Sequence, residues 1–236
     1  MKTRRIGDQE ILTPNLDPGG LDPVGHTPES DLAEAYVADQ SWAKAHFSGV
    51  SLSRSHVERV DLTETHWRDV ALYGCRLDRV NLSGAKLTGV MMERCHLVDC
   101  RLTALQLADT TLKNVILEDC RLDHATLLHV RTTGPAAVTG CDLSHSLLVQ
   151  SRFFGLVARS CRLTGVEVDD CDTTGADLRD NDLRQVGRGL TSLRGAVIEE
   201  SQIAHLATLA VRELQLTVRS RSDCAVIRDT AKGQLG

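Results

Sequence analysis

The hydrophobic residues of this sequence recur with a strict period of five. Every fifth residue from Leu32 to Leu127 is apolar, which makes twenty such positions in succession. Because 42% of all residues are hydrophobic, a run of this length would arise by chance only about once in 30 million sequences. An α-helix repeats about every 3.6 residues and a strand about every two. The period therefore predicts a repeat architecture built of five-residue steps.

A second position of each step is restricted as well. The residue two places before each apolar centre is small in nearly every step, and the other three residues are mostly polar. Small residues at this position include Cys75, Ala85, Cys95, Cys100, Cys120 and Ala125. We therefore expect two residues of each step to face a narrow core and three to face water.

The frame of the repeat changes twice. It slips by one residue near 131–138, where Gly134 and Pro135 indicate a bulge, and it then resumes up to Leu183. A second irregularity lies at 187–189, where Arg188 takes the place of an apolar centre. We expect one continuous solenoid over residues 29–198.

Several steps, among them VNLSG, AKLTG, CDLSH and ADLRD, resemble the A(D/N)LXX motif of the pentapeptide-repeat family. The resemblance implies an all-β solenoid, a right-handed quadrilateral parallel β-helix with four steps per coil and about eight to nine coils. The sequence departs from the motif where His or Arg often replaces the Asp or Asn before the centre. This departure changes the surface and leaves the fold unaffected.

The two ends differ from the repeat. Residues 1–28 hold four of the five prolines, which predicts a flexible N-terminal tail. Residues 199–218 carry apolar residues at helical spacing, which predicts a helix that caps the last coil. Members of the family dimerise through this end, so the same segment also offers a homodimer interface with candidates Leu209, Leu214, Leu216 and Val218. Residues 219–236, with Cys224, are expected to form a second flexible tail.

Candidate reactive residues fit the repeat. Seven of the eight cysteines occupy small inward positions, so we expect free thiols that fill the core, without disulfides or a metal site. His46 and His66 lie twenty residues apart, as His124 and His145 do across the slip. Each pair stacks on the surface without enough ligands for a metal. The sequence has no nucleophile elbow and no phosphate-binding loop, so we expect neither an enzyme nor a cofactor.

Charge narrows the classes of function further. The net charge is −5, from 27 basic and 32 acidic residues, which argues against direct binding of nucleic acid. No stretch is apolar enough to cross a membrane, so we expect a cytoplasmic protein without a membrane partner. These observations favour a protein-interaction scaffold whose exposed surface binds a protein partner.

The resemblance to the pentapeptide-repeat family also offers an alternative function. One branch of that family consists of bacterial quinolone-resistance proteins and gyrase inhibitors. Their rods mimic DNA and occupy the DNA site of gyrase or another topoisomerase. Mimicry requires carboxylates arrayed along one side. The candidate acidic face consists of Glu167, Asp169, Asp170, Asp172, Asp177, Asp180 and Asp182. Columns of basic residues elsewhere, such as Arg101 with Arg121, weigh against this alternative.

Overall fold

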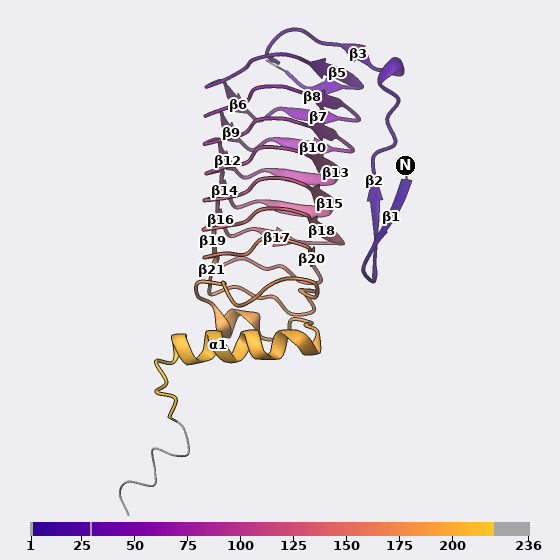
Figure 1. The fold of residues 1–236 in the computed structure, drawn as a ribbon. Helices are drawn as coiled ribbons and strands as arrows, with labels where there is room; N and C mark the ends of the chain where they lie inside the picture. Colours follow the sequence, from indigo (N-terminus) through magenta and orange to yellow (C-terminus); the bar gives the residue numbers. More distant parts are fainter. Residues whose placement is uncertain (1, 29, 220–236) are drawn as a thin grey trace, which may run out of the picture.

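The computed structural model describes residues 2–28 and 30–219, and these residues form a parallel β-solenoid with a hairpin beside it and a helix at its end (Figure 1). Strands one coil apart pair in parallel with a shift of twenty residues, as for Leu72 with Met92 and Leu87 with Leu107. Four five-residue steps therefore make one coil. The period predicted from the sequence is confirmed.

Each coil has four sides, which we number face 1 to face 4 in chain order. Face 1 contains β4 (Leu32–Ala33), β7 (Ser51–Ser53), β10 (Ala71–Tyr73), the first parts of β13 (Met91–Val98) and β15 (Thr111–Glu118), and β17 (Arg131–Thr132). Face 2 contains β3 (Asp22–Pro23), β5 (Ala35–Ala38), β8 (His56–Glu58), β11 (Arg76–Asp78), the second parts of β13 and β15, β18 (Ala136–Thr139) and β20 (Val157–Arg159).

Face 3 has isolated bridges in place of strands, for example between Arg101 and Arg121. Face 4 is a seven-stranded sheet of β6 (His46–Ser48), β9 (His66–Arg68), β12 (Lys86–Thr88), β14 (Gln106–Ala108), β16 (Thr126–Leu128), β19 (Leu147–Val149) and β21 (Glu167–Asp169). The rod has about seven turns, slightly fewer than the eight to nine predicted, because the outermost steps do not stack as strands on this face.

The core is a stack of thin layers made by the two restricted positions of each step. The centres Leu72, Leu87 and Leu102 are each 1% exposed, and the small residues Val80 and Cys95 are fully buried. The backbone turns at every corner two residues after a centre, where non-glycine residues also take positive φ, for example 52° at Asp69. Such turns leave the centre pointing inward and its two neighbours pointing outward.

The register of the strands changes by one residue within 131–138. Leu112 pairs with Thr132 at a shift of twenty residues, whereas Val115 pairs with Ala136 at a shift of twenty-one. The extra residue therefore lies in the corner between β17 and β18, next to Pro135, and it leaves both flanking strands paired.

The prediction of a flexible N-terminal tail is wrong for residues 2–13. They form an antiparallel hairpin of β1 (Lys2–Ile6) and β2 (Gln9–Thr13) that runs along the rod beside face 2 (Figure 1). Ile11 is fully buried against the solenoid. The four prolines all come after the hairpin. Pro23 belongs to β3, and the connection before it contains the short helix η1 (Pro18–Gly20).

The C-terminal end is closed by η2 (Leu190–Leu193), η3 (Glu200–Gln202) and α1 (Ile203–Glu213), shorter than the predicted helical segment. The buried Gln202 side chain donates to the carbonyl oxygens of Leu178 and Asn181, at 2.9 and 2.8 Å, and so satisfies the open end of the last coil. Residues 220–236, including Cys224 in the predicted second tail, lie outside the described residues. No helix among the described residues is long and apolar enough to cross a membrane.

Candidate functional site

The outward side chains form columns in which residues one coil apart are neighbours. Many of these neighbours carry opposite charges. Arg54 lies 2.9 Å from Glu34, and Arg162 lies 3.4 Å from Asp142. Ion pairs at exposed positions contribute little stability, but they balance the charge of the surface locally.

The structure does not bring the seven predicted acidic residues together on one face. They are close in sequence, and a stretch of this length winds around almost a whole coil. Glu167 and Asp169 belong to face 4, whereas Asp172 and Asp177 continue columns on faces 1 and 2. Asp182 stands at the corresponding outward position of face 3, one coil after Arg162. A single acidic side would require carboxylates spaced twenty residues apart.

Several of these carboxylates are also neutralised by nearby cations. Asp177 is buried and accepts hydrogen bonds from Arg179 and Arg159. The hydrogen bond from Arg179 lowers the pKa of Asp177. A hydrogen bond from Arg184 lowers the pKa of Asp182 to about 2. Glu167, Asp170 and Asp172 are exposed, and Asp180 accepts a hydrogen bond from the Ser160 hydroxyl at 2.6 Å.

Among the candidates for a dimer interface, Leu209 is placed differently from the prediction. It is fully buried and packs with Leu183 and Val186 under the helix, so it belongs to the cap. Leu214, Leu216 and Val218 are 62%, 53% and 75% exposed. These three stay available for contact with another molecule.

The cysteines and paired histidines lie where the repeat places them. The seven described cysteines are free thiols, and each thiol donates to main-chain carbonyl oxygens, as Cys75 does to that of Leu52 at 3.1 Å. Burial raises the pKa of Cys161 to about 12. His46 stacks on His66 with ring centroids 4.8 Å apart. Within residues 2–28 and 30–219, no group of three or more His, Cys, Asp or Glu side chains is placed to hold a metal ion.

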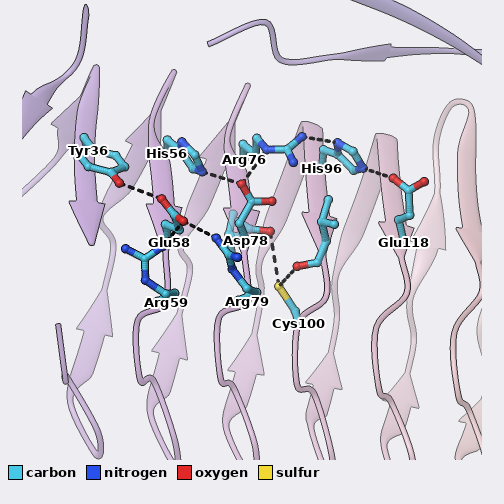
Figure 2. Close-up of polar contacts among 12 residues, drawn as sticks. Tyr36, His56, Glu58, Arg59, Arg76, Asp78, Arg79, His96, Cys100 and Glu118 are labelled. Carbon is cyan, nitrogen blue, oxygen red and sulfur yellow. Dashed lines mark hydrogen bonds and ion pairs between the residues drawn. The ribbon is translucent and has the colours of Figure 1, made fainter. Parts of the chain in front are cut away.

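A network of polar side chains runs along face 2 from one coil to the next (Figure 2). The Nε2 of His56 lies 2.7 Å from a carboxylate oxygen of Asp78, which also accepts from Nε of Arg76 at 2.7 Å. Arg76 continues the network by donating to Nδ1 of His96, 3.1 Å away. This network was not predicted from the sequence, because each histidine meets a carboxylate twenty-two residues later, one coil on and two residues further along the strand.

The network ends at the hairpin. Nε2 of His96 donates to Glu118 at 2.8 Å, and Arg4 of β1 donates two hydrogen bonds to the same carboxylate, at 2.6 and 2.9 Å. These hydrogen bonds, that from Arg4 foremost, lower the pKa of Glu118 to about 2. Burial lowers the pKa of His96. Because Nδ1 of His96 accepts from Arg76, the ring is neutral in this arrangement.

Below this network, the hairpin covers an apolar patch of face 2. Ile11 packs against Ile116, Ala137 and Val157, all buried. These three residues stand at the outward position just before a centre, one coil apart. That position is usually polar, so an apolar column there was the signal by which the covering hairpin could have been predicted.

Face 1 also carries uncovered apolar residues at outward positions, among them Phe154 and Met91, which is 44% exposed. Phe154 is 66% exposed, whereas Phe153 beside it is buried in the core. Arg152 lies on the other side of Phe153, and its main chain forms a parallel β-bridge with Arg131 of the previous coil. Neither arginine forms an ion pair with the residues that the structure describes. We call Phe154, Arg152 and Arg131 the face 1 surface.

A polar groove of about 610 Å³ lies at the adjoining corner between faces 1 and 4. His129 lines this groove, and its ring contacts Asp109 at 3.1 Å and Gln150 at 3.0 Å. The hydrogen bonds with Gln150 and then Asp109 raise the pKa of His129. Arg152 lines the same groove, so the groove is continuous with the face 1 surface.

Comparison with known proteins agrees with this geometry. The family model "Pentapeptide repeats (8 copies)" matches residues 68–103. This match identifies residues 68–103 as pentapeptide repeats, in agreement with the twenty-residue register of the strands. A search among curated protein sequences found no match.

The solved structures that are similar to this chain include those of QnrB1 and HetL. Full-length QnrB1, a plasmid-mediated fluoroquinolone resistance protein, is 14% identical over 87% of this chain and 99% of its own, with a TM-score of 0.48. HetL, a pentapeptide repeat protein involved in heterocyst differentiation regulation from the cyanobacterium Nostoc, is 19% identical over 72% of this chain and 90% of its own, with a TM-score of 0.37. At these values we transfer no property of either protein to this chain.

Proposed function

We propose that the protein is a non-enzymatic scaffold that binds a protein partner through the face 1 surface. One observation carries this proposal. The chain has seven aromatic side chains, all within the described residues, and Phe154 is the only one that is exposed. Aromatic and arginine side chains are the residues most enriched at the centres of protein interfaces.

The chemistry of the surface indicates what kind of partner it fits. Arg131 and Arg152 stand in register beside Phe154 and form no ion pair with the described residues, whereas Arg54 with Glu34 and Arg162 with Asp142 pair a cation with a carboxylate. Arginine binds carboxylates with two parallel hydrogen bonds, and an exposed phenyl ring binds an apolar side chain. The expected partner therefore presents an apolar residue flanked by acidic residues. The rigid register of the coils would hold the three anchors at fixed spacing.

Quantitative affinity purification from the native source, with the wild-type protein and single variants as baits, tests the proposal. We expect a partner that is retained by the wild type and reduced at least about tenfold with Phe154→Ser and with Arg152→Glu. Arg101→Glu is the matched control, since Arg101 is an exposed arginine of face 3. Equal recovery of every partner by all four baits would contradict the proposal.

The exposed residues at the C-terminal end support a second contact, with another copy of the chain. Leu214, Leu216 and Val218 are three large apolar side chains within five residues, each more than half exposed. We propose that they form a homodimer interface. Light scattering after size exclusion tests this, and we expect a dimer for the wild type and a monomer for Leu216→Asp. A monomeric wild type at the highest soluble concentration would refute the interface and leave the face 1 proposal intact.

DNA mimicry would require a different arrangement of charges on the surface. It requires a column of unpaired carboxylates, but the acidic residues of 167–182 are distributed around the coil and several are ion-paired. We therefore expect purified protein to leave supercoiling by DNA gyrase unchanged. Inhibition that is lost when Asp169, Asp170 and Asp172 are changed to Asn would support mimicry instead.

A further inference from the structure

A cavity of about 430 Å³ lies between the N-terminal segment and face 2. Its wall on one side is β1 with the connection that follows the hairpin, and on the other side it is the upper part of the face 2 network. Sites for small molecules are usually of about 300–1,000 Å³ and hold a few convergent polar groups. The side chains with basic groups that line it are Lys2, Arg4, His56, Arg76 and His96.

His56 has an unused hydrogen-bonding atom in this wall. The residue is 6% exposed, and Nε2 contacts the Asp78 carboxylate at 2.7 Å. A carboxylate only accepts at neutral pH, so Nε2 carries a proton. Nδ1, on the opposite side of the ring, is buried and has no partner among the described residues. Buried polar atoms are nearly always hydrogen-bonded, so each exception points to a missing partner.

The cations of the cavity are not equally engaged. Arg4 is held by both oxygens of Glu118. Arg76 donates from Nε to Asp78 and from Nη1 to His96, whereas its Nη2 forms no hydrogen bond with the described residues. Lys2, on β1, forms no ion pair with them either. The cavity therefore offers donors from Arg76 and Lys2, and its two neighbouring carboxylates, Asp78 and Glu118, are already occupied.

His56 can add a third donor to this set. The groups that face it are the Tyr36 ring on β5, with ring centroids 5.5 Å apart, Asp78 and Arg76 on β11, and the cations of β1 across the cavity. Because Asp78 fixes the proton on Nε2, Nδ1 of the neutral ring is an acceptor, and it donates to the ligand when the ring takes up a second proton together with the anion and becomes an imidazolium. A guanidinium, an ammonium and an imidazole N–H are the donor types that bind phosphate and carboxylate groups.

We propose that this cavity is a binding site for a small organic anion bearing a phosphate or carboxylate group. Arg76 and His56 bind the oxyanion from the solenoid, and Lys2 binds it from the hairpin. The site is separate from the face 1 surface and does not depend on the proposed scaffold function.

The proposal can be tested by NMR of the histidine rings in the full-length, ¹⁵N-labelled protein. Inorganic phosphate, glycerol phosphate and citrate are titrated separately at constant ionic strength. We expect saturable shifts of the His56 and His96 ring signals. The rings of His124 and His145 stack at the corner between faces 3 and 4 and should not shift, which controls for general ionic effects. Saturation by glycerol phosphate alone would identify the phosphate ester as the ligand class, and by citrate alone the carboxylate.

Two variants sharpen the test. Arg76→Gln removes the guanidinium and keeps a polar side chain, so it should weaken binding at least about tenfold, while Arg101→Gln on face 3 should leave binding unchanged. Circular dichroism establishes that each variant keeps the solenoid. The proposal is overturned if none of the three anions shifts the His56 signals saturably in the wild type, or if Arg76→Gln binds as tightly as the wild type.

Discussion

Face 1 and face 2 each carry apolar side chains at positions that the repeat turns outward. These side chains are covered on face 2 and exposed on face 1. On face 2, Ile116, Ala137 and Val157 are covered by Ile11 of the hairpin. On face 1, Phe154 is left 66% exposed. The repeat determines which positions face out, and apolar residues gathered there with other binding groups mark a candidate contact surface. The chain supplies that contact itself on face 2, and we infer that a partner supplies it on face 1.

The largest expected effect tests the division between inward and outward positions, on which this comparison rests. Leu102→Asp would bury a charge in a centre that is 1% exposed. We expect a loss of at least about 4 kcal/mol of unfolding free energy, enough to unfold the rod. Thr103→Ala, at the next, outward position, should change stability by about 1 kcal/mol or less, since it removes only the hydrogen bond to Asp123. Thermal melting followed by circular dichroism compares the two, and equal tolerance would refute the frame.

A smaller, local effect is expected where the hairpin meets face 2. Ile11→Asp should weaken docking of the hairpin by about 3 kcal/mol, roughly a hundredfold in the undocked population, because a fully buried side chain becomes charged. The solenoid itself should stay folded, since none of its core centres is changed. Trypsin cleavage after Arg4 and Arg5 measures the undocked population directly.

Leu12→Asp is the matched control for this variant. Leu12 is the next residue of β2, points away from the solenoid and is 39% exposed. Its replacement should leave cleavage near the wild-type rate. If both variants were cleaved equally fast, the apolar contact under the hairpin would not be what holds it.

The regular part of this architecture was predictable because one physical constraint is repeated many times. A narrow core admits one apolar and one small residue per step, so the frame, the slip near Pro135 and the buried cysteines all follow from periodicity. The hairpin was not predicted. It contains no repeat step, and among the described residues its only buried apolar side chain is Ile11. Nothing in the composition of residues 1–28 therefore separated it from the proline-containing connection that follows.

The candidate site was harder to predict because function depends on outward residues. The acidic run of 167–182 looked like one surface in the sequence, yet each step turns the chain to the next face. The face 2 network was missed for the converse reason. His56 and Asp78 are twenty-two residues apart, and they meet only because one coil separates the strands and the two positions flank neighbouring centres.

The pH dependence of hairpin docking tests the polar half of the same contact. The pKa of His96 is lowered from 6.5 and that of Glu118 from 4.5 to about 2. The folded form therefore resists protonation of both groups, and their contribution is complete above about pH 6.5. Docking should weaken as the pH falls below 6.5, because the undocked form then binds a proton on His96 more readily than the docked form does. It should weaken further from pH 4.5 toward 2, as Glu118 is protonated.

NMR signals of residues 2–13 in the intact protein report this docking. Glu118→Gln should weaken docking at neutral pH and remove the decrease below pH 4.5, while the decrease that starts near 6.5 should persist. A docked population that stays constant from pH 7 down to pH 3 would show that the Arg4, His96 and Glu118 contacts do not hold the hairpin.

The smallest expected effect on stability is that of replacing Phe154 on face 1. Phe154→Ser should change the unfolding free energy by no more than about 0.5 kcal/mol, because the ring is mostly in water and makes no contribution to the core. Phe153→Ser, one residue earlier, removes a ring that is 4% exposed and should cost about 3–5 kcal/mol. Chemical denaturation of both variants separates the two roles. A large loss of stability with Phe154→Ser would mean that the ring is covered within the chain, as on face 2, and would remove the reason to expect a partner there.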